Sequence, residues 1–230
     1  MKLNVIVPFF NTKPLYLREC LDSIYRQSFQ DFKILLINDG SFRYNYSNIV
    51  SNNKILYLKN PVNLGVCKSV NLAFSRVNSE YCIRVDSDDI IDPLLFEKEI
   101  SFLSSNEKYV GICCDIDKFY GSNKKHTHVI RPDNWNLDDI TRGKFRGYGY
   151  AGGMMFRSYV LSKIFLNEEY HICEDFEFHV KLLRFGKIHS LHENLYHYRK
   201  HDSQITGKFG RAQRAKYIQD VINRIRKKEL

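Results

Sequence analysis

The chain has 230 residues, of which 43% are hydrophobic and 14% aromatic, a composition that fits a folded globular protein and excludes a disordered one. No apolar run reaches the roughly 20 residues that a membrane-spanning helix requires. The formal net charge is +9, but residues 211–230 alone carry +5 of it. The remainder is only mildly basic, so we do not expect a nucleic-acid-binding protein.

The cysteines and the N-terminal residues indicate in which cellular compartment the protein is expected. The six cysteines form no Cys-x-x-Cys pair, and most of them lie in apolar runs, as buried free thiols do. Asn4 and Pro8 interrupt the short apolar stretch after the initial Met, so no secretory signal is expected. These features predict a reduced, cytoplasmic protein.

The first half of the chain alternates short apolar runs with amphipathic segments. The apolar, β-branched runs predict buried strands at residues 3–7, 32–39, 54–60 and 80–86. Helical spacing of apolar residues predicts helices at 15–28 and 65–77. Strand–helix–strand units at intervals of about 25 residues predict an α/β fold with a mainly parallel central sheet flanked by helices.

The second half has a looser pattern. The predicted helices are 96–106, 158–165, 173–186 and 211–230, and the predicted strands are 109–117, 151–157 and 188–201. Residues 118–150 form a long polar stretch, which predicts a functional or mobile loop. The last helix is basic and amphipathic, with one apolar stripe.

The stretch "CIRVDSDDIID", residues 82–92, runs from a predicted strand directly into a group of carboxylates. Asp86 and Asp88 flank Ser87, so both side chains point the same way if the backbone is extended. Two such carboxylates suit a hard divalent cation, Mg²⁺ or Mn²⁺, that takes further oxygens from substrate phosphates. The alternative is a solvated turn in which Asp92 caps a helix beginning at Pro93.

Polar residues also follow other predicted strands. Asn11 and Asp39 follow the first and second strands, and Asp86 follows the fourth. Ligands bind beyond the carboxyl ends of the strands in sheets of this kind. The three residues therefore predict a ligand site at one edge of the sheet.

Seven short motifs occur in a particular order between about residue 3 and residue 206. They are "VPFFN", "INDGS", "NLGVCKSVN", "RVDSDD", "GGMMFR", "EDFEFHVKL" and "YHYRKHDSQIT". In this order they resemble the family 2 glycosyltransferases of GT-A, Rossmann-like fold. The chain departs from that pattern at Phe10, Asn38 and Val70, where the family commonly has Tyr, Asp and Arg.

The resemblance implies a nucleotide-sugar site. The nucleotide-binding residues that it implies are Pro8, Phe10, Asn11, Asp39, Asn63, Lys68 and Asp86. It implies Mn²⁺ or Mg²⁺ as cofactor, with Asp88 as metal ligand and His201 as a contact to the metal or the diphosphate. Each residue also has a structural reading: Asp39 as a turn residue before Gly40, Lys68 as a solvated helix residue and His201 as a surface histidine.

The resemblance also implies the catalytic residues. Asp175 would be the general base that takes a proton from an acceptor hydroxyl, and Glu174 would orient it or bind the acceptor. One base and one metal imply single displacement with inversion at the sugar carbon. The structural reading is that both acids stabilise the N-terminus of a helix, and this can hold alongside catalysis.

From these features we expect a GT-A domain over 1–210, with a nucleotide-binding half (1–117) and an acceptor-binding half (118–210), followed by a basic helix over 211–230. The expected enzyme is a hexosyltransferase that uses a UDP-sugar, with GDP and dTDP as alternatives. We expect it to act on a glycan or lipid-linked acceptor in surface polysaccharide or glycan synthesis. The rival hypotheses are an inactive nucleotide-sugar-binding module and a nucleotidyltransferase, although "VPFFNTKP" is not a glycine-rich phosphate loop.

Two segments concern the acceptor. Trp135, Tyr148 and Tyr150 suggest an aromatic wall against sugar rings. The basic helix either lies on a membrane surface, making the enzyme peripheral, or packs its apolar stripe on the domain, and we favour packing because the stripe is narrow.

Overall fold

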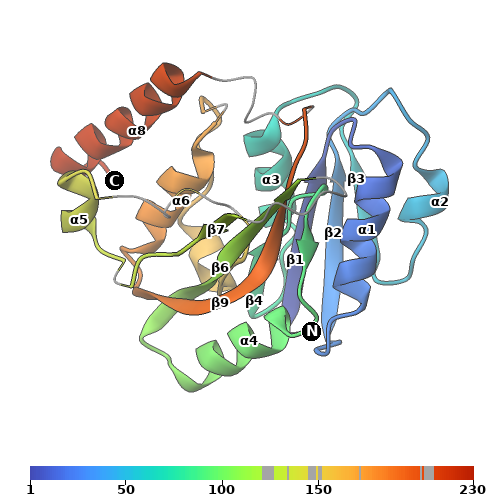
Figure 1. The fold of residues 1–230 in the computed structure, drawn as a ribbon, viewed down its shortest axis with the longest axis horizontal. Coiled ribbons are helices and arrows are strands. Elements are labelled where there is room, and N and C mark those ends of the chain that lie inside the picture. Colours follow the sequence, from blue (N-terminus) through green and yellow to red (C-terminus); the bar gives the residue numbers. More distant parts are fainter. Residues whose placement is uncertain are drawn as a thin grey trace.

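The computed structural model describes residues 1–120, 127–133, 135–144, 149, 152–170, 172–202, 204 and 210–230. Its strands form one twisted mixed sheet with helices on both faces (Figure 1). The strand order is β3-β2-β1-β4-β8-β6-β9-β5, and β7 pairs with β6 outside this path. The predicted α/β class with a central sheet flanked by helices is confirmed.

The N-terminal strands form the parallel part of the sheet. They are β1 (Leu3–Phe9), β2 (Phe32–Asn38), β3 (Ile55–Lys59) and β4 (Tyr81–Arg84). β1 lies between β2 and β4, with Leu3 opposite both Phe32 and Tyr81. All four strands therefore end at the same edge of the sheet.

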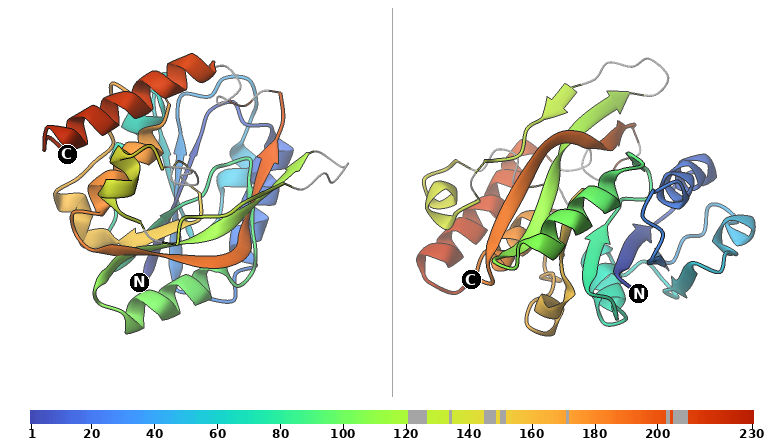
Figure 2. Two further views of the ribbon diagram at one scale, coloured as in Figure 1. Left: turned by 60° about the vertical axis from the view of Figure 1, so that its left-hand side comes forward. Right: turned by 90° about the horizontal axis from the view of Figure 1, so that it is seen from below.

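The remaining strands make the sheet mixed. They are β5 (Ile90–Ile91), β6 (Tyr109–Tyr120), β7 (Thr127–Val129), β8 (Met154–Arg157) and β9 (Lys187–Lys200). β8 runs antiparallel to both β4 and β6, whereas β6 and β9 are parallel. The long strands β6 and β9 curve side by side away from the N-terminal strands (Figure 2).

Two hydrophobic clusters lie on the two faces of the sheet. One contains the apolar sides of α1 (Pro14–Tyr25) and α4 (Leu95–Ser105). The other contains those of α3 (Val66–Phe74), α6 (Glu174–Leu182) and α8 (Arg211–Arg226). Adjacent β1 residues alternate between the clusters, Val5 to the first and Ile6 to the second, so this strand is apolar on both sides.

Short elements complete the fold. They are α2 (Ser47–Val50), α5 (Leu137–Thr141) and the 3₁₀ helix η1 (Ser158–Ser162). The prediction of a long loop over 118–150 is wrong for part of this stretch, because β6 extends to Tyr120 and the stretch also contains β7 and α5. The end of β6 pairs with β9 and with β7, and the polarity of the local sequence does not reveal this pairing.

Trp135 does not form an acceptor wall. Its side chain is buried in the second cluster, where its Nε1–H donates to Ser190 Oγ at 2.8 Å and its ring meets His179 edge-on. This part of the prediction is wrong, because Trp135 packs in the core instead of facing solvent. Tyr148 and Tyr150 lie outside the described residues.

The apolar stripe of α8 packs on the domain. Val221 and Ile222 are buried in the second cluster, and Tyr217, Ile218 and Ile225 pack against it. The packing reading of this helix is therefore confirmed for its apolar face. Within the described residues, no helix is long and apolar enough to cross a membrane.

Candidate active site

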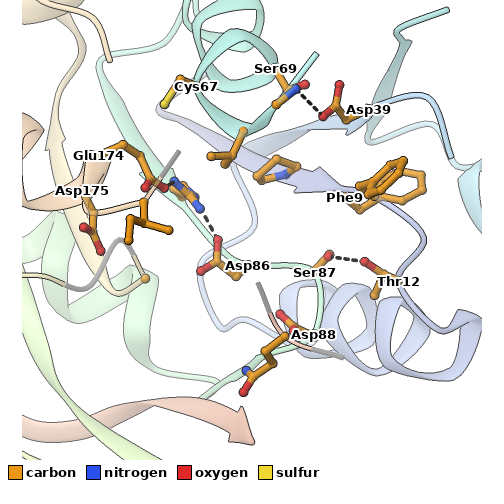
Figure 3. A pocket seen from close by; sticks show the side chains of 18 of the residues that line it. Phe9, Thr12, Asp39, Cys67, Ser69, Asp86, Ser87, Asp88, Glu174 and Asp175 are labelled. Atoms are coloured by element: carbon orange, nitrogen blue, oxygen red, sulfur yellow. Dashed lines mark hydrogen bonds and ion pairs between the residues drawn. The ribbon is translucent and has the colours of Figure 1, made fainter. Parts of the chain in front are cut away.

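A cavity of about 760 Å³ opens where β1, β2 and β4 end, at the edge that the sequence predicts for a ligand. Its volume suits an organic ligand of cofactor size. Figure 3 shows Asp86 and Asp88 on one part of its wall and Glu174 with Asp175 on another. Residues from the segment 8–88 supply the first part, and Ile116 with described residues between 149 and 204 supplies the rest. The predicted catalytic residues and all predicted nucleotide-binding residues except Lys68 therefore meet in one cavity.

Asn11 and Asp39 organise the loops after β1 and β2. Asn11 has a left-handed backbone (φ 52°), and its Oδ1 accepts the backbone N–H groups of Phe42 and Arg43, both at 3.0 Å. The buried Asp39 accepts the N–H groups of Leu64 at 2.8 Å and Gly65 at 3.0 Å. Both side chains line the cavity while fixing its loops, and their contact with a nucleobase stays a prediction.

Three further residues that were predicted to bind the nucleotide line the same end of the cavity, whereas a fourth, Lys68, lies outside it. Pro8, Phe10 and Asn63 are on the wall, and the half-exposed ring of Phe10 meets Phe42 edge-on at 6.1 Å. Lys68 is exposed on α3 and lies outside the cavity wall. Its neighbours Cys67 and Ser69 face inward instead, because adjacent helical residues point in different directions (Figure 3).

Arg84, the last residue of β4, joins two carboxylates of the cavity. Its Nε donates to Asp86 Oδ1 at 2.8 Å, and its Nη1 donates to Glu174 Oε1 at 3.0 Å. The arginine side chain is 14% exposed and that of Glu174 is 10% exposed. Burial raises the pKa of the Asp86 carboxyl, and the Arg84 guanidinium opposes that rise.

Asp88 pairs with His201 at the cavity wall. Asp88 Oδ2 lies 2.8 Å from His201 Nε2, and the side chains are 24% and 14% exposed. A carboxylate and an imidazole that converge in this way fit a divalent cation such as Mn²⁺. The described residues hold no group of three or more protein ligands for a metal. The pair therefore suits an ion whose remaining ligands come from substrate phosphates.

Asp89 is the buried neighbour of this pair and has a structural role. Its Oδ2 accepts the Tyr196 hydroxyl and its Oδ1 accepts the Arg199 N–H, each at 2.8 Å. The Tyr196 oxygen also accepts the Asp86 N–H at 3.0 Å. Asp89 thereby ties the acidic turn to β9, which carries Arg199 and leads directly to His201.

Asp175 is the second residue of α6 and faces the cavity (Figure 3). Its Oδ1 accepts the N–H of Phe176 at 2.7 Å, and the described residues offer it no ion pair. Burial, reinforced by the charge of Glu174, raises the pKa of Asp175 to about 7. A carboxyl with this pKa can exchange a proton near neutral pH, as a general base must.

Two thiols also line the cavity, Cys67 and Cys173. Cys67 Sγ donates to the Tyr170 carbonyl at 3.0 Å, and Cys173 precedes α6 with a left-handed backbone (φ 61°). Burial and the carboxylates of α6 raise the pKa of both thiols to about 12. All six cysteines are free, as the sequence predicts.

Sequence reasoning missed three residues that organise this site: Arg84, Tyr196 and Arg199. Arg84 meets Glu174 across 90 positions, and Tyr196 meets Asp89 across 107. No local pattern encodes such contacts. The one available signal is the cation of Arg84 immediately before an acidic cluster.

The fold is that of the GT-A class, as a comparison with solved structures shows. The S. aureus TarS fragment 1–349 in complex with UDP-GlcNAc has a TM-score of 0.78 to this chain, covering 96% of it and 65% of that chain. Sequence identity is 21%, so this likeness shows the fold alone.

Sequence relatives identify the family. An uncharacterized glycosyltransferase of Haemophilus influenzae is 27% identical over 224 residues, 92% of this chain and 69% of that protein. The amylovoran biosynthesis glycosyltransferase AmsE of Erwinia amylovora is 30% identical over 146 residues, 61% of this chain and 55% of that protein. The model of glycosyl transferase family 2 matches residues 4–165, and the chain belongs to this family. The chain spans about half to two thirds of the length of the proteins that it matches.

Proposed function

We propose that the chain is a metal-dependent inverting glycosyltransferase that moves a sugar from a UDP-sugar to a hydroxyl of a glycan or lipid-linked acceptor. The observation that carries this proposal is one cavity lined both by the Asp88–His201 pair and by Asp175. A TarS fragment was solved with UDP-GlcNAc, which supports a UDP-sugar as donor. The name of AmsE, an amylovoran biosynthesis enzyme, supports a role in polysaccharide synthesis.

The protein groups have separate tasks in this proposal. Asp175 accepts the proton of the acceptor hydroxyl as the oxygen attacks the anomeric carbon. Asp88 and His201 would hold a divalent cation, Mn²⁺ or Mg²⁺, which neutralises charge on the leaving diphosphate. Asn11 and Asp39 fix the loops around the nucleotide end of the cavity. One base with no covalent intermediate gives inversion at the sugar carbon.

The proposed location is the cytoplasm, with peripheral contact to a membrane that carries the acceptor. Because the apolar stripe of α8 is buried, this contact would use the exposed cations on the helix and directly after it: Lys216, Arg226, Lys227 and Lys228. Each cation near an anionic surface contributes about 1 kcal/mol, which gives weak, salt-sensitive binding.

Nucleotide binding is the first test. Calorimetric titrations with UDP, GDP and dTDP, with and without Mn²⁺, should show UDP binding that requires the metal. Asp88→Ala should abolish the metal-dependent part, whereas Glu107→Ala, an exposed control outside the cavity, should bind normally. Absence of binding by every nucleotide would refute the proposal.

Transfer is the second test. UDP-sugars incubated with candidate acceptors should release UDP, and proton NMR should show a product of inverted anomeric configuration. Retention of configuration would contradict the single displacement. Nucleotide binding without any transfer by the full chain would favour a binding module.

A further inference from the structure

Arg84 occupies a central place between the two walls of the cavity. It ends β4, and its guanidinium reaches Asp86 through Nε and Glu174 through Nη1, at 2.8 and 3.0 Å. One of these partners belongs to the acidic turn after β4 and the other begins α6. The side chain is only 14% exposed, so both contacts are shielded from solvent.

The chemistry of the side chain suits this place. A guanidinium is planar and carries donors in a fixed fork, so two carboxylates that bind it are held at a set separation. A lysine ammonium is a flexible point charge that imposes no such geometry. Removing the arginine would leave the half-buried Asp86 and the buried Glu174 without their cation.

We propose that Arg84 is a positioning residue for catalysis: by joining Asp86 to Glu174 it fixes the base helix against the donor side of the cavity and leaves Asp175 facing the reacting groups. This inference rests on the proposed function. Arg84 then has two separable effects: its forked guanidinium fixes the position of α6, and its positive charge lowers the pKa of Asp175.

The charged and titratable groups around Asp175 set the sign of the second effect. Glu174 and Cys173 precede it on its own segment, Arg84 and Asp86 face it from β4, and the chain before α6 adds Glu168 and Tyr170 to the wall. Tyr196 lines the wall from β9. Glu174 and Asp86 raise the pKa of Asp175, and Arg84 lowers it. Arg84→Gln should therefore raise this pKa, and Glu174→Gln should lower it.

The decisive experiment measures Asp175 directly. The side-chain carboxyl of Asp175 is titrated by carbon-13 NMR in the full chain without substrate, in wild type, Arg84→Gln and Glu174→Gln. A neighbouring charge shifts a pKa by about 1 unit or more, so the midpoint should move up in Arg84→Gln and down in Glu174→Gln. Asp175→Asn identifies the resonance. Arg76→Gln, an exposed arginine outside the cavity, is the matched control and should leave the midpoint unchanged.

Transfer kinetics separate geometry from charge. In Arg84→Lys the charge remains but the fork is lost, so kcat should fall by about tenfold to a hundredfold while the acidic limb of the pH profile stays near its wild-type position. In Arg84→Gln the limb should move to higher pH along with the NMR midpoint. A purely structural arginine would lower kcat in both variants without moving the limb.

The outcomes distinguish this inference from the proposed function. An unchanged Asp175 midpoint in folded Arg84→Gln overturns the role of Arg84 even if transfer is observed. If Arg84→Gln does not fold, Glu174→Gln decides, and failure to lower the midpoint overturns the electrostatic link. If the midpoints shift as expected but the wild-type chain transfers no sugar, the function fails while the link between Arg84 and Asp175 stands.

Discussion

Two acidic clusters face each other across the cavity, one in the turn after β4 and the other at the start of α6. In the first, Asp89 is buried and bonded to Tyr196 and Arg199, while Asp88 meets His201 at the wall. In the second, Glu174 is paired with Arg84, while Asp175 has no ion pair among the described residues.

The comparison shows that each cluster contains acids fixed by side chains or N–H groups of the fold, Asp86 and Asp89 in the first and Glu174 in the second, beside one acid to which the proposed function gives a reactive role, Asp88 or Asp175. Adjacent carboxylates differ because Asp89 and Glu174 each meet a donor or cation from a distant element. The fixed acids hold their segments in place, and Asp88 and Asp175 line the cavity. The number of acids in a motif therefore overstates the number that can act on a substrate.

Asp175→Asn should have the largest effect. It removes the proposed base without changing side-chain size, so kcat should fall by about 10² to 10⁴-fold, the usual contribution of general base catalysis. Nucleotide affinity, measured by calorimetry, should stay near that of wild type. A variant that retains wild-type kcat would show that the reactive acid of α6 has been assigned incorrectly.

The acidic turn gives the next largest effect and directly contrasts its two acids. Asp89→Ala leaves the Arg199 N–H and the Tyr196 hydroxyl without their acceptor, so the free energy of unfolding should fall by about 3 kcal/mol. Asp88→Ala, at the cavity wall, should change it by less than about 1 kcal/mol. Urea denaturation of both variants measures the difference. Equal losses would mean that the division between fixed and reactive acids does not hold here.

The pH dependence of transfer should show the third effect. The pKa of Asp175 is raised to about 7, and only its ionised form accepts a proton, so the rate should rise with pH and reach half its plateau near pH 7. At one unit below the pKa about a tenth of the base is ionised, so the rate should be about tenfold lower there. A profile that is flat between pH 5 and 8, at saturating donor and metal, would contradict this assignment.

Stability should respond to pH in the opposite direction. Because the pKa of Asp175 is higher in the folded protein than its ordinary 3.8, the ionised form is less favourable there, and stability is lost as pH rises through about 7. Asp175→Asn avoids this loss. Its melting temperature relative to wild type should therefore be higher at pH 8 than at pH 4, which thermal unfolding at both values tests.

Tyr196→Phe should have the smallest effect. It removes one of the two donors to Asp89 and the acceptor of the Asp86 N–H but leaves the Arg199 N–H, so the loss of unfolding free energy should be about 2 kcal/mol. Tyr159→Phe, at a largely exposed tyrosine, is the control and should change little. A loss as large as that of Asp89→Ala would assign most of the stabilisation of the turn to Tyr196.

Sequence patterns predicted the parallel part of the sheet well. β1, β2 and β4 are apolar runs within a few residues of their predicted bounds, because strands covered on both faces must be apolar throughout. The two-residue β5 was missed because its partner β9 lies about a hundred residues further along the chain, and the three-residue β7 was missed because it is too short to show an apolar pattern. Trp135 was misplaced because an isolated aromatic in a polar stretch does not reveal whether it is buried.

The motifs also located most of the candidate site. The cavity wall contains the predicted metal ligands and catalytic residues: Asp88, His201, Glu174 and Asp175. It also contains six of the seven predicted nucleotide-binding residues. Lys68 is the exception, because it lies on the side of its helix that faces away from the cavity, unlike its neighbours Cys67 and Ser69. The partners that divide each acidic cluster could not be predicted, since Arg84 and Glu174 become neighbours only in the folded chain.

The thiols of the cavity have a practical consequence for chemical probes. Alkylating reagents and peroxides react with thiolates, and at neutral pH a thiol with a pKa of about 12 is almost entirely protonated. We therefore expect Cys67 and Cys173 to react slowly with these reagents although both lie on the cavity wall. An inhibitor for this site should gain its affinity from the carboxylates and the ring of Phe10, and a cysteine-directed reactive group should not label these two thiols.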